Sequence, residues 1–176
     1  YWQDNRWGES KIYGSIITPS FDDSYNIFSN EDINGKSLTS LPLAQENPES
    51  ILAGNNIFLS FKVEESPNEN LYFQLLNMNL TQNGNAVALA SNSTSKQGFD
   101  MTYSNDGYIY YAYSENYDIS IQKINSSGIE QWTVSAVTNT ADDLIQSIYP
   151  NLESGSGCII IYESQSFIEG SHIYAL

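Results

Sequence analysis

Residues 107–113 read GYIYYAY, and this stretch decides the fold class. It follows the turn-forming pair Asn105-Asp106, and after its glycine every residue is apolar or aromatic. A continuous apolar run of this length between turn residues is typical of a strand that is covered on both faces. We therefore predict an inner β-strand here.

Two other stretches have the same character, NNIFLSF at 55–61 and GCIIIYE at 157–163. Each of the three runs is followed, after a polar loop, by a second stretch in which apolar and polar residues alternate more. Almost no segment has the apolar spacing of a helix, and turn residues interrupt the chain every eight to twelve residues or so. The sequence therefore predicts an all-β fold built from hairpins.

The hairpins recur with a period of about fifty residues, which indicates an internal repeat. The three apolar runs open at Ile57, Tyr108 and Cys158. Weaker strands at 85–91 and 130–138 follow Asn-Gly or Ser-Gly turns, and we assign each to the beginning of the next repeat. Two further sets of residues keep a similar spacing: Pro48, Phe99 and Pro150, and Tyr72, Ser120 and Ile173.

Four antiparallel strands in a repeat of this length are typical of a β-propeller blade, which buries its faces only by stacking on neighbouring blades. Residues 1–18 would hold the third and fourth strands of an incomplete blade, and three further blades would span 19–78, 79–126 and 127–176. About three and a half blades leave open edges, so we expect either a longer polypeptide or a ring completed by a second copy. A β-solenoid and a β-sandwich are the alternative folds.

The first hairpin carries a motif of the form W-x-D-x-R-x-G-x-x-x-I-Y, and parts of the same repeat recur at 45–48, 125–132 and 146–150. This pattern resembles a blade repeat of bacterial secreted and cell-surface β-propeller proteins. The resemblance implies a propeller fold, a location outside the cell or on its surface, and a structural role for the repeat positions. These positions are Trp2, Asp4, Arg6, Gly8, Ile12, Tyr13, Pro48, Trp132, Pro150, Tyr162 and Tyr174.

The charge and the composition exclude several classes of partner. The chain has 176 residues, with 21 acidic against 6 basic side chains and a formal net charge of −15. An acidic surface repels phosphate groups, so we expect no nucleic-acid partner and no binding to an anionic membrane. No apolar run is long enough for membrane insertion. Cys158 is the only cysteine, which excludes an internal disulfide, and we expect it to pack as a small apolar side chain.

Catalytic motifs are weak. His172 is the only histidine, and no serine or cysteine nucleophile with a matching base is recognisable. Sialidase-type propellers need a cluster of arginines, for which this chain has few basic residues. Glycosidases need two facing carboxylates, and no feature of the sequence selects a pair. We therefore predict a protein that is not an enzyme, with a glycoside hydrolase or sialidase-like activity as the alternative.

Acidic loops suggest the one candidate cofactor, calcium, since carboxylate oxygens are its preferred ligands. The candidate ligands are Asp22 with Asp23, and Asp142 with Asp143. The alternative is an acidic surface that keeps the protein soluble. Asp4 and Arg6 are expected to tie neighbouring blades together, or else to contact a ligand.

These observations favour a non-catalytic extracellular propeller module for binding or adhesion to protein or carbohydrate at a cell surface. A structural subunit of a surface assembly or filament is the alternative of a different class. A few of the many aromatic side chains would then form a stacking platform for sugars on the rim of the ring. The expected partners are a protein or a carbohydrate, the remainder of the same chain, or a second copy.

Overall fold

The secondary structure is entirely β within the described part of the chain. The computed structural model describes residues 1–5, 8–16, 35–65, 68–90, 96–138, 142–166 and 170–176. These residues form strands and turns and no helix, which confirms the all-β prediction. Accordingly, none of these segments contains a helix long and apolar enough to cross a membrane.

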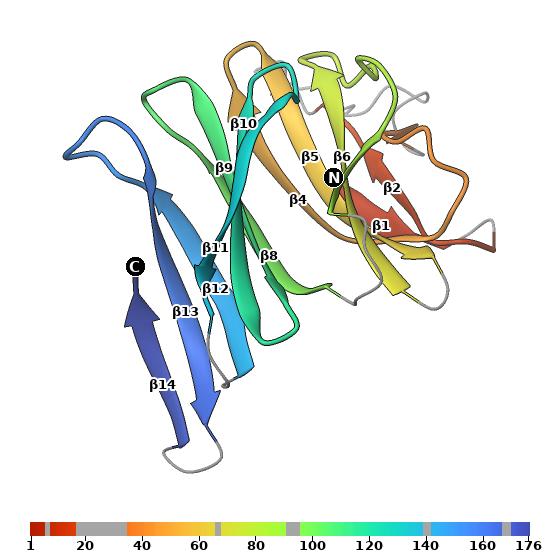
Figure 1. Cartoon of the computed structure of the whole chain (residues 1–176). Helices are drawn as coiled ribbons and strands as arrows, with labels where there is room; N and C mark the ends of the chain where they lie inside the picture. Colours follow the sequence, from red (N-terminus) through yellow and green to blue (C-terminus); the bar gives the residue numbers. More distant parts are fainter. Residues whose placement is uncertain (6–7, 17–34, 66–67, 91–95, 139–141, 167–169) are drawn as a thin grey trace, which may run out of the picture.

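The strands form four antiparallel sheets, which we number I to IV in chain order (Figure 1). In each sheet, consecutive strands of the chain lie side by side. Sheet I contains β1 (Trp2–Asp4), β2 (Lys11–Gly14) and β3 (Lys36–Ser37); sheet II contains β4 (Gln45–Ala53), β5 (Asn56–Glu65), β6 (Asn68–Asn77) and β7 (Val87–Ala90); sheet III contains β8 (Lys96–Tyr103), β9 (Tyr108–Glu115), β10 (Asp118–Asn125) and β11 (Glu130–Val137); sheet IV contains β12 (Asp142–Pro150), β13 (Cys158–Ser166) and β14 (Gly170–Ala175).

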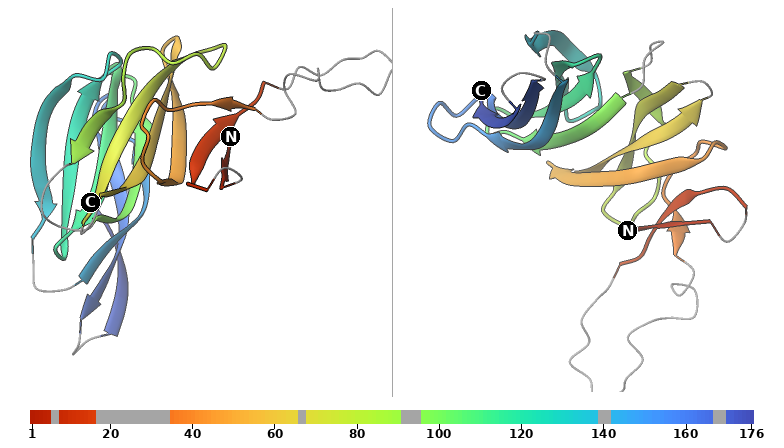
Figure 2. Two further views of the ribbon diagram at one scale, coloured as in Figure 1. Left: turned by 90° about the vertical axis from the view of Figure 1, so that its right-hand side faces the viewer. Right: turned by 90° about the horizontal axis from the view of Figure 1, so that it is seen from below.

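The four sheets follow one another in space in the order in which they follow in the chain (Figure 2). Strand β4 contacts β1 and β2, β8 contacts β4 and β6, and β12 contacts β8, β9 and β10. The first strand of each of sheets II to IV therefore packs against the preceding sheet. This stacking matters because a small sheet of three or four strands buries enough apolar surface only against a neighbour.

The hydrophobic core is divided among the three junctions, which we call the I–II, II–III and III–IV cores. In β5, Phe58 points into the II–III core, whereas Leu59 points into the I–II core. In β9, Tyr111 points into the II–III core and Tyr110 into the III–IV core. Successive residues of a strand face opposite sides of its sheet, so an apolar residue at every position fills two cores. The prediction that these runs are covered on both faces is confirmed for β5 and β9. It is wrong for β13 within the described structure, where Ile160 is buried in the III–IV core but Ile159, on the other face, is 40% exposed.

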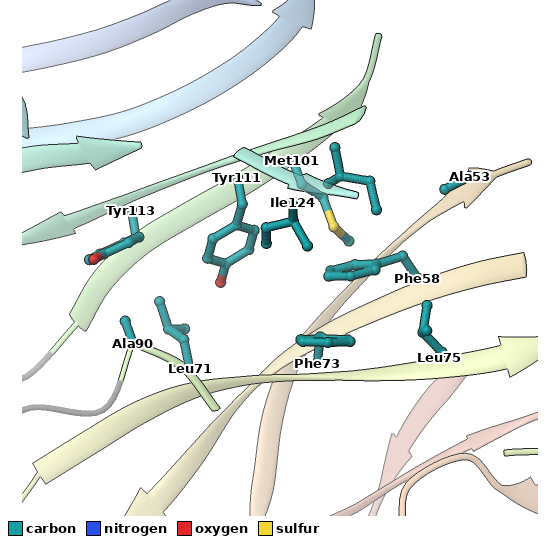
Figure 3. Packing of buried hydrophobic residues seen from close by; sticks show 11 residues of the cluster. Ala53, Phe58, Leu71, Phe73, Leu75, Ala90, Met101, Tyr111, Tyr113 and Ile124 are labelled. Carbon is teal, nitrogen blue, oxygen red and sulfur yellow. The ribbon is translucent and has the colours of Figure 1, made fainter. Parts of the chain in front are cut away.

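The II–III core shows how tightly two sheets meet (Figure 3). The rings of Phe58 and Phe73 are stacked with centroids 4.4 Å apart, and Tyr111 and Met101 approach them from sheet III. All four side chains are buried. Burial of each large apolar side chain contributes about 1.5–3 kcal/mol, so this junction makes a large contribution to the stability of the stack.

The assignment of strands 85–91 and 130–138 to the beginning of the following repeat was wrong. Strand β7 pairs with β6, and β11 pairs with β10, so each is the last strand of the preceding sheet. The segment at 36–37 likewise pairs with β2 of the first hairpin, and sheet I has three strands rather than two. A short turn joins a strand to the one directly before it, which is why the turn at Asn125–Gly128 keeps β11 in sheet III.

The evenly spaced residues also prove not to be equivalent in structure. Ile57 packs against the I–II core, on the side of the preceding sheet, whereas Tyr108 packs against the III–IV core, on the side of the following sheet. Pro48 lies in a β-bulge early in β4, whereas Pro150 ends β12 opposite Cys158. A shift of one residue in register reverses the face of a side chain, so a period of about fifty residues fixed the number of units but not their alignment.

Candidate functional site

A pocket opens at the junction of sheets I and II, and we call it the I–II pocket. Its volume is about 340 Å³, and polar side chains line it. Four of them come from the first hairpin and one from β4. The lining residues are Gln3, Asp4, Asn5, Ser10 and Glu46.

A β-bulge and two cross-sheet hydrogen bonds shape this pocket. The bulge interrupts the pairing of β4 with β5 between Glu46 and Glu49, and Asn47 within it has a positive φ of 49°. Beside it, the backbone N–H of Gln45 donates to the carbonyl oxygen of Ser10 at 2.9 Å, and the hydroxyl of Ser10 donates to the carbonyl oxygen of Gln45 at 2.9 Å. The bulge therefore takes Asn47 and Pro48 out of the regular ladder directly after Glu46, while the hairpin is held against β4.

The lining of the I–II pocket suits a hydrophilic ligand without negative charge. Asp4 and Glu46 supply carboxylate acceptors, and the side chains of Gln3, Asn5 and Ser10 supply both donors and acceptors. The Glu46 carboxylate repels an anion, whereas it accepts hydrogen bonds from hydroxyl groups and amines. The pocket therefore has the hydrogen-bonding groups required to bind a hydroxyl-rich ligand.

A second pocket of about 180 Å³ lies at the equivalent place between sheets II and III, and we call it the II–III pocket. It is again built at a bulge, here in β8 between Lys96 and Phe99. Its lining combines a carboxylate, an amine, an amide and an aromatic ring. The residues are Asn47, Glu49, Lys62, Gly98 and Phe99.

The protonation equilibrium of the Glu49 carboxyl group in the II–III pocket is shifted by its surroundings. Desolvation against the neighbouring sheet raises the pKa of Glu49, and the negative charge of Asp100 raises it further. Asp100 itself is held in place, because its carboxylate accepts hydrogen bonds from the backbone N–H of Met101 at 2.7 Å and of Ile148 at 2.9 Å. The Glu49 carboxyl group and the Lys62 amine therefore give this pocket both a hydrogen-bond acceptor and a donor.

A cluster of charged and aromatic side chains joins sheets III and IV, and we call it the Lys123 cluster; it comprises Asp106, Tyr108, Tyr110, Lys123 and Trp132. The Lys123 Nζ lies 3.0 Å from the Asp106 Oδ2 and 4.1 Å from the centre of the Tyr108 ring. The Tyr110 hydroxyl donates to the Asp106 carboxylate at 2.8 Å, and Trp132, 39% exposed, meets the Tyr110 ring edge-on.

The contacts within the Lys123 cluster favour the charged forms of both ionisable partners. Partial burial alone raises the pKa of a carboxyl group, but hydrogen bonds from Lys123, Tyr110 and the Tyr108 backbone lower the pKa of Asp106. Contacts with Tyr110 and then Asp106 raise the pKa of Lys123 against the effect of desolvation. Since the backbone N–H of Gly157 also donates to the Tyr110 hydroxyl at 3.1 Å, the cluster ties sheet III to sheet IV.

The positions selected from the repeat are distributed over the structure rather than gathered in one site. Asp4 reaches the I–II pocket, and Trp132 belongs to the Lys123 cluster. Gly8 has a positive φ of 99° in the turn of the first hairpin, Pro48 lies in the β4 bulge and Pro150 ends β12. Arg6 lies outside the described residues. The remaining positions are packing residues: Ile12 is fully buried, and Trp2 with Tyr13 and Tyr162 with Tyr174 form stacked ring pairs.

Only two of the four predicted calcium ligands lie in the described part of the chain. Asp142 and Asp143 open β12, and Asp143 is fully buried. Asp22 and Asp23 lie outside the described residues. Within the described ranges, no group of three or more histidine, cysteine, aspartate or glutamate side chains is placed to hold a metal ion.

The Cys158 thiol and the His172 ring have different surroundings, because Cys158 is half-buried and His172 is exposed on β14. Burial raises the pKa of the Cys158 thiol to about 11, so the reactive thiolate is scarce at neutral pH. The ring of His172 lies beside that of Tyr174 on β14, at a distance of 6.3 Å between centroids.

Most residues of the two pockets were missed by the sequence analysis, because no single one belongs to a recognisable motif. One signal was present in the sequence: Pro48 stands inside a predicted strand, and proline within a strand is typical of a bulge. Since bulges redirect neighbouring side chains, Glu46 and Glu49 could have been selected from it. Comparison with known proteins adds no assignment: no protein-family model matches the chain, and no curated protein matches it.

Proposed function

We propose that the protein is a non-catalytic extracellular binding module of the β-propeller type, which binds carbohydrate at a cell surface. The I–II pocket carries this proposal, since its carboxylate, amide and hydroxyl groups match the hydroxyl groups of a neutral sugar. The Phe99 ring in the II–III pocket supplies an apolar surface for the second site of the same kind.

The arrangement of the sheets supports the propeller part of the proposal. Each central sheet is a meander of four antiparallel strands, and each sheet stacks on the next in chain order. Recurring pockets at the sheet junctions are what a ring of similar blades would offer to a ligand at one end. A propeller of this type predicts that further sheets of the same kind continue the stack.

A glycan array followed by titration calorimetry tests the binding. We expect neutral oligosaccharides to bind and sialylated or sulfated ones to bind less, because the pocket carries carboxylates. The variant Glu46→Gln replaces the carboxylate by an uncharged amide of nearly the same size and shape. Its affinity for a glycan that the wild type binds should be lower by about tenfold or more. Glu153→Gln is the matched control, since Glu153 is exposed in the loop between β12 and β13.

Two results would contradict the proposal. One is the absence of any bound glycan across a broad neutral panel. The other is equal loss of affinity, or no loss, in the Glu46 and Glu153 variants, which would place the ligand elsewhere. Turnover of the glycan during the titration would instead support the enzymatic alternative.

A structural subunit of a surface assembly is a second candidate function. The observation in its favour is the apolar outer face of sheet IV, where Tyr149, Ile159 and Ile173 are 55%, 40% and 65% exposed. Exposed apolar side chains that share one face of a sheet favour a contact with another protein.

A further inference from the structure

The outer face of sheet IV is apolar and exposed within the described structure. Tyr149 of β12 lies directly opposite Ile159 of β13, and Ile173 of β14 lies opposite Glu163. Residues directly opposite each other share a face of the sheet, and alternate residues of β13 share it too. The other face of sheet IV, with Ile160, belongs to the III–IV core. Figure 1 shows sheet IV at the end of the row of sheets, with this face turned away from the others.

The corresponding faces of the sheets before it are covered, and always in the same way. Sheet II presents Phe58 and Phe73 on the side of the following sheet, where sheet III covers them. Sheet III presents Ile119 and Ile121 on the side of its following sheet, where sheet IV covers them. The exposed face of sheet IV is therefore the next member of a series of interfaces that the chain forms with itself.

The opposite end of the row has a matching surface. Three sheets carry a stacked pair of aromatic rings on neighbouring strands, with centroids 5.5–6.5 Å apart: Trp2–Tyr13, Phe61–Tyr72 and Tyr162–Tyr174. In sheets II and IV this pair faces the preceding sheet, where it contributes to the I–II and III–IV cores.

Sheet I shows its aromatic pair on the corresponding side. Ile12 points toward sheet II in the I–II core, and Tyr13 is the next residue of the same strand. Trp2 lies directly opposite Tyr13 and shares its face. The Trp2–Tyr13 pair therefore occupies the side of sheet I that corresponds to a covered side in sheets II and IV.

We propose that the outer face of sheet IV docks on the outer face of sheet I of a second copy of this chain, so that copies associate head to tail. The contact repeats the geometry of the I–II and III–IV junctions within the chain, where an apolar face of one sheet meets an aromatic pair of the next. An interface of this heterologous kind leads to a closed ring or to an open chain, depending on the rotation between copies.

The charge of the protein predicts an unusual salt dependence for this association. Each copy carries a formal net charge of −15, so two copies repel each other at low ionic strength. Salt screens this repulsion and leaves the burial of apolar side chains unaffected or stronger. Association should therefore increase with salt, whereas a contact held by ion pairs would weaken.

Sedimentation velocity over about a hundredfold range of concentration, at low and high salt, tests the proposal. We expect the wild-type mass to rise with concentration and with salt. Ile173→Glu, or Ile159→Glu if the first variant folds poorly, should weaken association by about tenfold or more. Ile129→Glu is the matched control, because Ile129 is 61% exposed, similar to Ile173 at 65%, and lies in the turn before β11.

A mixing experiment identifies the second face. Tyr13→Ser, or Trp2→Ser in its place, should weaken self-association as Ile173→Glu does. A mixture of the Tyr13 and Ile173 variants should regain pairs, since each variant keeps one intact face, but no larger assemblies. A wild-type protein that stays monomeric in all conditions overturns the proposal, as does equal weakening by the Ile129 variant. Association that persists in the Tyr13 variant overturns the head-to-tail arrangement. So does a mixture of the Tyr13 and Ile173 variants that does not regain pairs.

Discussion

The hydrogen bond between Ser60 and Tyr111 offers a sharp test of the stacking of sheets II and III. The Ser60 hydroxyl donates to the Tyr111 hydroxyl at 3.0 Å, across the junction, and both residues are fully buried. Burial raises the pKa of Tyr111 well above its ordinary value, so the phenol is neutral over the whole range in which the protein is handled. The pair is therefore a neutral hydrogen bond out of reach of solvent.

The energetic consequence depends on whether one hydroxyl or both are removed. Tyr111→Phe leaves the buried Ser60 donor without its acceptor, and Ser60→Ala leaves the Tyr111 oxygen without its donor. Each single change should lower the free energy of unfolding by about 1–3 kcal/mol, because a buried polar group left unpaired bears its full desolvation cost. The double variant removes both polar groups, so it should be less destabilised than the sum of the single variants by about 1 kcal/mol or more.

Urea unfolding of the four proteins, followed by circular dichroism and by fluorescence, measures this coupling. In thermal unfolding, each 1 kcal/mol corresponds to a shift of about 2–4 °C for a chain of this size. Tyr117→Phe is the control, since Tyr117 is 61% exposed. Removal of its hydroxyl group should lower the free energy of unfolding by less than about 0.5 kcal/mol. Strictly additive effects of the Ser60 and Tyr111 changes would show that the two hydroxyls do not meet, and would refute the stacking of sheet II on sheet III at this point.

Three further predictions concern the sheet junctions. Desolvation and the charge of Asp100 raise the pKa of Glu49, so ionisation of this carboxyl group destabilises the fold. The protonated Glu49 contributes fully to stability below the ordinary glutamate pKa, and this contribution is lost as pH rises through the raised value. Glu49→Gln should therefore increase the melting temperature at pH 7 and not at pH 3. The pKa of Asp106 is lowered and that of Lys123 is raised, so their pairing stabilises the fold between the ordinary aspartate pKa and the ordinary lysine pKa. Lys123→Met should lower the free energy of unfolding in urea by about 1–2 kcal/mol at pH 7. A loss of the same size down to acid pH would contradict this prediction. Gly98→Ala places a Cβ 3.0 Å from a carbonyl oxygen of β12. Although alanine reduces the entropy of the unfolded chain, the variant should be less stable by about 1 kcal/mol or more, and a stabilised variant would show that β8 and β12 lie farther apart.

The two pockets illustrate how far sequence reasoning could reach the candidate site. Asp4 was selected because it stands in the motif of the first hairpin, and it does reach the I–II pocket. Glu46 was not selected, because its direction depends on a bulge that forms only when β4 pairs with β5. Ser10 and Gln45 are 35 residues apart, and their hydrogen bond depends on the packing of two sheets. A site assembled from such separate segments has no local signature in the sequence.

The sequence by itself determined the all-β character and the four-unit organisation, because apolar runs, alternation and turn residues are local properties that act within a hairpin. It also marked the inner strands, since a strand such as β9 with apolar residues at every position must be covered on both sides. Only the tertiary structure decided which sheet β7 and β11 join, and which way residues such as Ile57 and Tyr108 face. The physical reason is that pairing partner and register are set by contacts between distant segments, and a shift of a single residue reverses every side chain of a strand.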